Sequence, residues 1–213
     1  MHIILQEDFK MFEMNVPYDK GTMKISLPEK NLAGVLEGKQ SEYTTELSEK
    51  ELVEQSLDNP IGSKSLEELA KGKKDIVIIS SDHTRPVPSK IITPILLRRI
   101  RSVSPDARIR ILVATGFHRP STHEELVDKY GEEIVANEEI VMHISTDDAS
   151  MKKIGVLPSG GDCIINKIAA EADLLISEGF IEAHFFAGFS GGRKSVLPGI
   201  ASYKTIMANH SGE

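Results

Sequence analysis

The chain has 213 residues with one cysteine and no tryptophan, and its formal net charge at pH 7 is -7. This length allows one large domain or two small ones with a substantial aliphatic core. The acidic balance argues against a nucleic-acid binder or a membrane-surface protein, because both normally present a basic face. Cys163 has no partner for a disulfide, and neither a secretory leader nor a run of about 18 apolar residues occurs. We therefore expect a soluble cytoplasmic protein.

Residues 1–72 predict a small β/α extension that packs on the rest of the chain. Two Ser-x-x-Glu patterns are typical of capping boxes, in which the serine and the glutamate satisfy each other's backbone amides at a helix start. The predicted elements are a turn at 19–21, a strand at 23–27, a helix opened by Ser48 and Glu51 that ends before Pro60, and a helix at 66–70 opened by Ser65 and Glu68.

Residues 73–213 alternate between strand and helix patterns. The run Ile76–Ile79 is β-branched throughout, which is typical of a strand buried on both faces. Such alternation favours right-handed crossovers onto a mainly parallel sheet. We expect a three-layer, Rossmann-like α/β core with helices on both faces, forming one domain together with the extension. The further predicted elements are helix 90–103, strand 109–114, a helix capped by Ser121 and Glu124 that runs through Tyr130, strand 140–144, helix 164–172, strand 174–177 and helix 202–210.

Three predicted loops follow strands of this sheet, and each carries a histidine and an arginine. In parallel sheets ligands bind beyond the carboxyl ends of the strands, so these loops should meet at one edge. Arg85, Arg119, Arg193 and Lys194 stand out against the acidic background and predict a local anion site. The loops are 80–86 with His83 and Arg85, 115–120 with His118 and Arg119, and 179–194 with His184 and Arg193.

The third loop is rich in glycine, which lets a backbone approach a ligand closely. Gly188–Ser195 reads G-F-S-G-G-R-K-S and nearly spells a phosphate loop. That motif requires glycine directly before the lysine, where this chain has Arg193, so the nucleotide-binding match fails. A glycine-rich turn with solvated cations is the alternative interpretation.

Histidines on separate loops suggest paired acid and base chemistry. His118 and His184 could remove a proton from a small substrate and return one on the opposite face. Arg85 suits a carboxylate through its two-pronged guanidinium, which points to a hydroxy or keto acid. Two alternatives stay open: any one loop histidine can be structural, as we expect for His2, His123 and His143, and His118, His184 and His210 could form the site of a zinc-dependent hydrolase.

Three motifs resemble the nickel-pincer lactate racemase family, whose members include relatives acting on other 2-hydroxy acids. They are S-S-D-H-T-R-P-V-P at 80–88, A-T-G-F-H-R-P at 114–120 and G-F-I-E-A-H-F-F-A-G-F-S-G-G-R-K-S-V-L-P-G-I at 179–200. The early Y-D-K-G-T-M and L-P-E-K-N-L-A-G-V-L also fit, so the resemblance covers nearly the whole chain. Ala183 and Asp19 depart from it, where Pro and Gly are common.

The resemblance implies a racemase or epimerase of a small 2-hydroxy acid. Members transfer a hydride reversibly to a nickel-pincer nucleotide, a pyridinium thioamide/thiocarboxylic acid mononucleotide tethered to a lysine. By position in the motifs, Lys194 is the tether, His210 the nickel ligand, and His118 and His184 the acid and base. Asp82, His83, Thr84 and Arg85 would bind the cofactor, with Arg85 also holding the substrate.

Family members are roughly twice as long as this chain, with a second domain that closes the cleft. The resemblance therefore implies an amino-terminal domain whose partners are the substrate, a C-terminal domain and the enzymes of cofactor biosynthesis. An isolated domain that binds a small anion or the cofactor without activity of its own is the alternative.

Overall fold

The computed structural model describes residues 10–184 and 187–210, which fall into two compact units at 1–46 and 47–213. In these described parts, no helix is both long and apolar enough to cross a membrane. The predicted boundary near residue 72, between the extension and the α/β core, stays a prediction.

The first unit contains an antiparallel hairpin of β1 (Met11–Tyr18) and β2 (Gly21–Pro28). Asp19 lies in the turn with a φ of 50°, a left-handed conformation that aspartate adopts more readily than most residues. The predicted turn and strand are thus confirmed within the hairpin, whereas β1 was not predicted. Short 3₁₀ helices follow at Glu29–Asn31 and Lys39–Glu42.

The second unit is built on a parallel four-stranded sheet in the order β5-β4-β3-β8. Alternate residues of β3 enter two different hydrophobic clusters, Ile76 and Ile78 on one face and Val77 and Ile79 on the other. A strand covered on both faces has no polar side, which explains its unbroken β-branched run. The predicted α/β class is confirmed. The strands are β3 (Asp75–Ser81), β4 (Arg108–Ala114), β5 (Glu139–Met142) and β8 (Leu174–Ser177).

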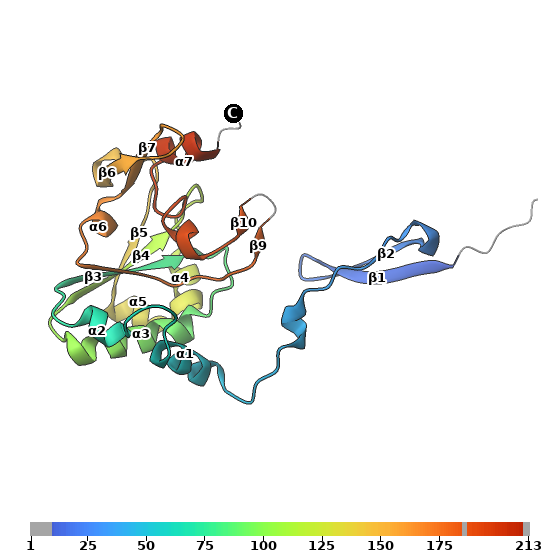
Figure 1. Cartoon of the computed structure of the whole chain (residues 1–213), viewed down its shortest axis with the longest axis horizontal. Coiled ribbons are helices and arrows are strands. Elements are labelled where there is room, and N and C mark those ends of the chain that lie inside the picture. Colours follow the sequence, from blue (N-terminus) through green and yellow to red (C-terminus); the bar gives the residue numbers. More distant parts are fainter. Residues whose placement is uncertain (1–9, 185–186, 211–213) are drawn as a thin grey trace, which may run out of the picture. The chain divides into compact units, whose positions relative to one another are not determined.

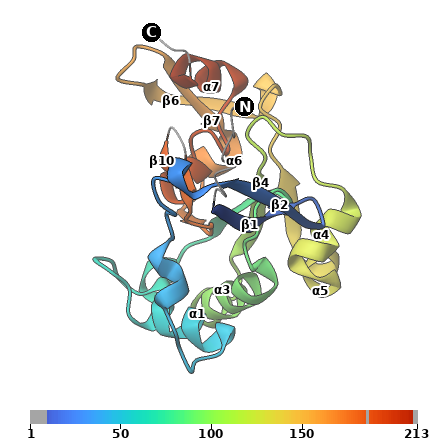
Figure 2. The ribbon, with the colours of Figure 1, turned by 90° about the vertical axis from the view of Figure 1, so that its right-hand side faces the viewer.

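Five helices cover one face of this sheet (Figure 1). Figure 2 shows α1 beside α3 and α4 beside α5. The capping box of α4 is formed by Thr122 and Glu125, so the predicted box one residue earlier is wrong. Ser121 instead places its hydroxyl 3.0 Å from Nδ1 of His83. The helices are α1 (Glu49–Asp58), α2 (Leu66–Ala70), α3 (Ser89–Val103), α4 (His123–Tyr130) and α5 (Glu132–Asn137).

The other face is covered by α6, β7 and the chain around Ile200. The predicted helix over 164–172 is wrong in its first part, because residues up to Asn166 pair with β6 in a hairpin. Asn166 then caps α6 through its side chain. Both views place α7 beside β7 (Figures 1 and 2). The remaining elements are β6 (Met151–Val156), β7 (Asp162–Asn166), α6 (Lys167–Ala170), β9 (Ala183–His184), β10 (Gly188–Phe189), α7 (Tyr203–His210) and 3₁₀ turns at Asp148–Ser150 and Gly192–Ser195.

Candidate active site at the carboxyl ends of the strands

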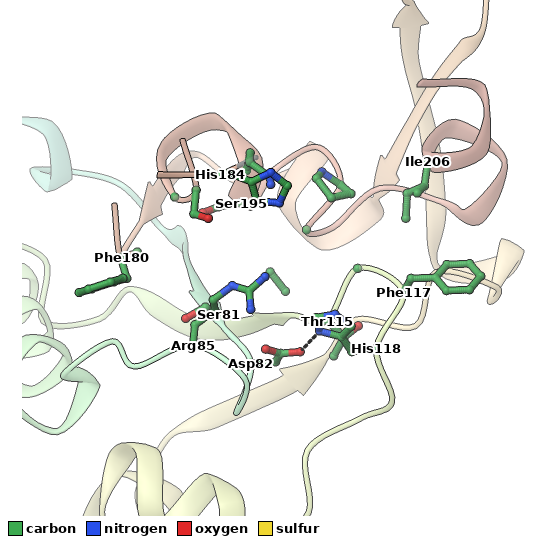
Figure 3. A pocket seen from close by; sticks show the side chains of 18 of the residues that line it. Ser81, Asp82, Arg85, Thr115, Phe117, His118, Phe180, His184, Ser195 and Ile206 are labelled. Carbon is green, nitrogen blue, oxygen red and sulfur yellow. Dashed lines mark hydrogen bonds and ion pairs between the residues drawn. The ribbon is translucent and has the colours of Figure 1, made fainter. Parts of the chain in front are cut away.

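A cavity of about 280 Å³ opens where the chain leaves β3 and β8. The loop after β3 leads to α3 on one face, while the segment after β8 leads to the opposite face. Such a switch point leaves a crevice beyond the strand ends. The predicted meeting of the three loops is confirmed, because all three line this first cavity together with α7 (Figure 3). Its polar lining includes Asp82, Arg85, His118, His184, Lys194 and His210.

Asp82 and His118 are in direct contact in the first cavity, with 2.6 Å between Oδ2 and Nδ1. Thr84 donates two more hydrogen bonds to the other carboxylate oxygen. Burial opposes ionisation of Asp82, but the hydrogen bonds from Thr84 and His118 outweigh it and lower its pKa. An ionised Asp82 accepts the proton on Nδ1 of His118, so the neutral ring carries its lone pair on Nε2.

His184 has the opposite arrangement. Its Nδ1 accepts a hydrogen bond from the Ala187 amide at 3.3 Å, so the neutral ring carries its proton on Nε2. Partial desolvation, together with the positive charges of Lys194 and Arg85, lowers the pKa of His184. Figure 3 shows His184 and the Asp82–His118 pair bordering the cavity from opposite sides. The cavity thus places an imidazole lone pair and an imidazole N–H on different loops.

Two cations line the same cavity. Desolvation, followed by the charge of Arg85, lowers the pKa of Lys194. Gathering like charges costs free energy, which a bound anion would recover. A lowered pKa also increases the fraction of neutral amine, the form in which lysine acts as a nucleophile. The lining by Arg85 and Lys194 therefore fits both an anionic ligand and a covalent attachment at Lys194.

His210 joins the cavity from the last turn of α7. Its Nδ1 lies 3.0 Å from the carbonyl oxygen of Ile206, to which it donates. This hydrogen bond sets the tautomer that carries its lone pair on Nε2, as metal-binding histidines usually do. Within the described residues, no cluster of three or more His, Cys, Asp or Glu side chains is placed to hold a metal ion.

Glycines allow the backbone to close tightly around the cavity. A Cβ on Gly191 would lie 2.6 Å from the carbonyl oxygen of Phe180, and the φ of Gly191 is 72°. Gly116 also has a positive φ of 56°, and its amide donates to the carbonyl of Gly199 at 2.9 Å. A side chain at Gly191 would therefore force apart the two segments that border the cavity.

Three residues predicted at this edge lie outside the lining of the first cavity. His83 contacts Ser121, and Arg119 forms a two-pronged ion pair with Glu125 at 2.8 and 2.6 Å. Arg193 belongs to the same loop as Lys194 but does not line the cavity. Of the four cations predicted to form an anion site, Arg85 and Lys194 line the first cavity and the other two do not.

Sequence reasoning missed the support beneath the cavity. Glu178, at the end of β8, is buried and accepts hydrogen bonds from Ser80, from Ser89 at 2.6 Å and from Thr93 at 3.3 Å. These contacts join β8, β3 and α3 directly below the loops that carry Asp82 and His184. A glutamate that directly follows an apolar strand was the available signal.

The fold and this lining define an α/β domain with a polar crevice at its switch point. Residues 18–212 match the family described as the lactate racemase N-terminal domain. The chain is 78% identical to a lactate racemase of Lactiplantibacillus plantarum and 54% identical to one of Thermoanaerobacterium thermosaccharolyticum, each over 203 residues. The chain belongs to the lactate racemase N-terminal domain family. Both alignments cover 95% of this chain and 48% of the relative, so the chain spans about half the length of these curated relatives.

Solved structures agree with this assignment. The lactate racemase apoprotein from Thermoanaerobacterium thermosaccharolyticum superposes with a TM-score of 0.84 at 53% identity, covering 93% of this chain and 46% of that one. A protein from Thermotoga maritima gives a TM-score of 0.60 at 22% identity, covering 76% of this chain and 40% of that one, which shows a similar fold alone.

Proposed function

We propose that this chain is the cofactor-bearing part of a racemase that inverts a small 2-hydroxy acid, with lactate as the first candidate. Family membership supports the reaction class, because the relatives named above are lactate racemases. The observation that carries the proposal is the complementary pair of histidines in the first cavity. His118 has its lone pair on Nε2 and His184 has its proton on Nε2, as their hydrogen bonds with Asp82 and Ala187 require.

The two histidines divide the proton transfers. His118 accepts the substrate hydroxyl proton at Nε2, while Asp82 stabilises the imidazolium that forms. When the opposite face is reduced, His184 in its imidazolium form donates its Nε2 proton to the oxygen and becomes neutral, and the roles exchange in the reverse direction. Arg85 binds the substrate carboxylate. The intermediate keto acid is flat, so the face that receives the hydride sets the configuration, and a histidine on each side can protonate the oxygen of either enantiomer as it forms.

The residues present fit the nickel-pincer nucleotide. We infer that Lys194 holds it covalently through an amine whose pKa is lowered, and that Nε2 of His210 ligates the nickel. An imidazole nitrogen suits a square-planar nickel. When bound, the group supplies a hydride acceptor and donor. The proposal also includes cofactor contacts for Asp82, His83, Thr84 and Arg85. Of these, His83 and Thr84 lie outside the lining of the first cavity.

A second domain would complete the enzyme. Large apolar side chains are exposed at or beside the first cavity, and an exposed apolar group of this kind is typical of a contact surface. We propose that this rim meets a C-terminal domain of the full-length protein, and that the whole protein works in the cytoplasm. The residues are Phe117, Phe180, Ile181 and Phe189.

Intact mass and nickel content test the cofactor assignment. The chain is produced together with the pincer-cofactor biosynthetic enzymes, as wild type, Lys194→Ala and Lys204→Ala. Lys204 is a matched control, since it is an exposed lysine that pairs with Asp148 and does not belong to the cavity lining. We expect a mass adduct and about one nickel per chain in wild type and Lys204→Ala, and neither in Lys194→Ala. An adduct that survives in Lys194→Ala would disprove the tether.

Activity is tested separately in the full-length protein, where binding without turnover is the competing outcome. If the loaded wild-type protein racemises none of lactate, malate or another 2-hydroxy acid, the domain is a cofactor-binding module and the proposed reaction is wrong.

A further inference from the structure

A second cavity of about 440 Å³ lies on the α4 side of the loop that carries Asp82 and Arg85. Its walls are the loop after β3, the first turn of α3 and the α4 residues Glu125, Asp128 and Lys129. Arg85 lines both cavities, so this loop is the partition between them. The catalytic residues proposed above line the first cavity, whereas His83 and Thr84, the two proposed cofactor contacts outside it, line the second. The family resemblance assigned no role to Lys129.

Lys129 is the buried charge of the second cavity, with an exposed fraction of 9%. Its ammonium donates to the hydroxyl of Ser81 and to the carbonyl of Arg85, both at 3.4 Å. Within the described residues, no carboxylate lies within 4.0 Å of it, the limit for an ion pair. Burial lowers the pKa of Lys129, although the negative charges of Glu178 and Asp82 oppose the shift through space. Those charges and two long hydrogen bonds to neutral acceptors compensate the buried ammonium only in part, because most of its hydration is lost. The cavity therefore offers a positive charge that an anion would satisfy.

The two carboxylates of the lining already have cationic partners. Glu125 is held by both terminal nitrogens of Arg119, and the Asp128 side chain is 93% exposed and lies 3.6 Å from Nζ of Lys90. Lys90 and Arg85 are further cations of the lining. His83 contributes a ring that is hydrogen-bonded to Ser121. Since the exposed Asp128 is screened by water, the charge that dominates the interior is that of Lys129.

We propose that the second cavity is a binding site for a phosphate group, with Lys129 as its principal ligand and Lys90 at its mouth. A phosphate oxygen replaces the long bonds of Lys129 with a short charge-assisted one. Lys90 and His83 supply further donors within the same lining. The cavity volume exceeds that of one phosphate ion, so a phosphate monoester also fits. A phosphate bound in the second cavity would compete with the Arg85 carbonyl for the Lys129 ammonium. Because Arg85 lines both cavities, the experiment must show which of the two binds phosphate.

Amide chemical shifts of the isotope-labelled chain locate the binding site. Inorganic phosphate is titrated into the wild type and into Lys194→Met, in which the first cavity has lost a cation. We expect saturable shifts for Val87, Lys90 and Lys129 in both proteins. Shifts confined to the first cavity, at Gly116 and Gly191, or no saturable shift at all, would overturn the proposal. Because this map needs no change at Lys129, it is decisive even if variants there fold poorly.

The side-chain assignment is tested with Lys129→Met, which keeps the length of the stem and removes the charge. We expect its phosphate affinity to fall about tenfold or more, since a hydrogen bond to a charged group is worth roughly 1.5–3 kcal/mol. Lys152→Met is the matched control, because Lys152 pairs with Glu171 outside either lining. Equal affinity in Lys129→Met and wild type would reject Lys129 as the ligand. Glycerol 3-phosphate is titrated in parallel, and tighter binding than inorganic phosphate assigns the site to a phosphorylated metabolite rather than to the free ion.

Discussion

The helical layer, formed by α1–α5, raises the pKa of a cation that it buries, whereas the first cavity lowers one. In the helical layer, Arg99 of α3 is 10% exposed and bonds Glu54 at 3.0 Å, Asp58 at 2.7 Å and also Glu67. The hydrogen bond to Glu67, with those to Asp58 and Glu54, raises the pKa of Arg99 despite its burial. In the cavity, burial and the charge of Arg85 lower the pKa of Lys194 instead. The ion pairs of Arg99 hold α1 and α2 against α3. The like charges of Arg85 and Lys194 instead destabilise the folded chain and indicate a ligand-binding site.

The largest expected effect separates activity from stability. In the full-length protein, His118→Ala should lower racemisation by about a thousandfold, because general acid–base groups typically contribute 10²–10⁴-fold. The unfolding free energy should fall by only about 1–3 kcal/mol, because the His118 side chain is 48% exposed but the buried Asp82 carboxylate loses its hydrogen bond to it. Initial rates with each enantiomer and denaturant titration measure the two quantities.

His123→Ala is the control for this prediction, because His123 lies in the first turn of α4 and lines neither cavity. Its racemisation rate should equal that of the wild type. Unchanged racemisation in both His118→Ala and His184→Ala would contradict the paired-histidine mechanism.

The reverse pattern is expected in the helical layer. Arg99→Met should lower the unfolding free energy by about 2–3 kcal/mol, because three carboxylates lose their shared partner. Phosphate and cofactor binding should stay as in wild type. Arg98→Met is the matched control, since Arg98 is 62% exposed and pairs with Glu54. A loss above about 1 kcal/mol there would mean that exposed pairs stabilise this layer more than usual.

The main elements of the helical layer and the loops of the first cavity could be predicted from local sequence. The capping boxes at Ser48 and Ser65 fixed the starts of α1 and α2, and the β-branched run of β3 marked the central strand. The loops of the first cavity followed from the rule that parallel strands end at one edge. Family motifs then supplied the roles of single residues, which stay predictions.

Other features depend on contacts between distant segments. The S-T-H-E-E run after Pro120 holds two overlapping capping boxes, and the hydroxyl of Ser121 approaches His83, which is 38 positions away. A short segment such as Ile164–Asn166 can form a helix or a strand equally well. Here its pairing with β6 makes it a strand. The ion pair of Arg119 with Glu125 likewise removes a cation that the sequence placed at the anion site.

The buried His143 should make stability depend on pH. Burial lowers its pKa below the ordinary 6.5, although its hydrogen bond with the Ala201 carbonyl opposes the shift. The unfolded chain therefore binds more protons at acidic pH, so this contribution is complete above pH 6.5 and is lost as the pH falls. Between about pH 6.5 and 5, the unfolding free energy should fall by up to about 1.4 kcal/mol per pH unit.

Denaturant titrations at several pH values measure this slope. In His143→Gln the slope should largely disappear, because no group titrates in that place while an amide can still donate to the carbonyl. His184 also has a lowered pKa but lies in β9 at the first cavity, outside the hydrophobic core. His184→Gln should therefore keep most of the slope of unfolding free energy against pH. If the slope disappears in His184→Gln instead, the pH dependence arises in the first cavity and not in the core.

The smallest expected effect concerns the start of α1. Ser48→Ala removes the hydroxyl that accepts from the Glu51 amide, while the backbone amide of residue 48 can still donate to the Glu51 carboxylate. We expect a loss of about 1 kcal/mol in unfolding free energy, the usual value for a helix cap. Ser56→Ala in the same helix should instead be neutral or slightly stabilising, because its hydroxyl bonds the Val53 carbonyl and alanine is the better helix former. Since Glu54 and Asp58 lie on α1, a much larger loss in Ser48→Ala would show that the cap also holds the carboxylates around Arg99 in place.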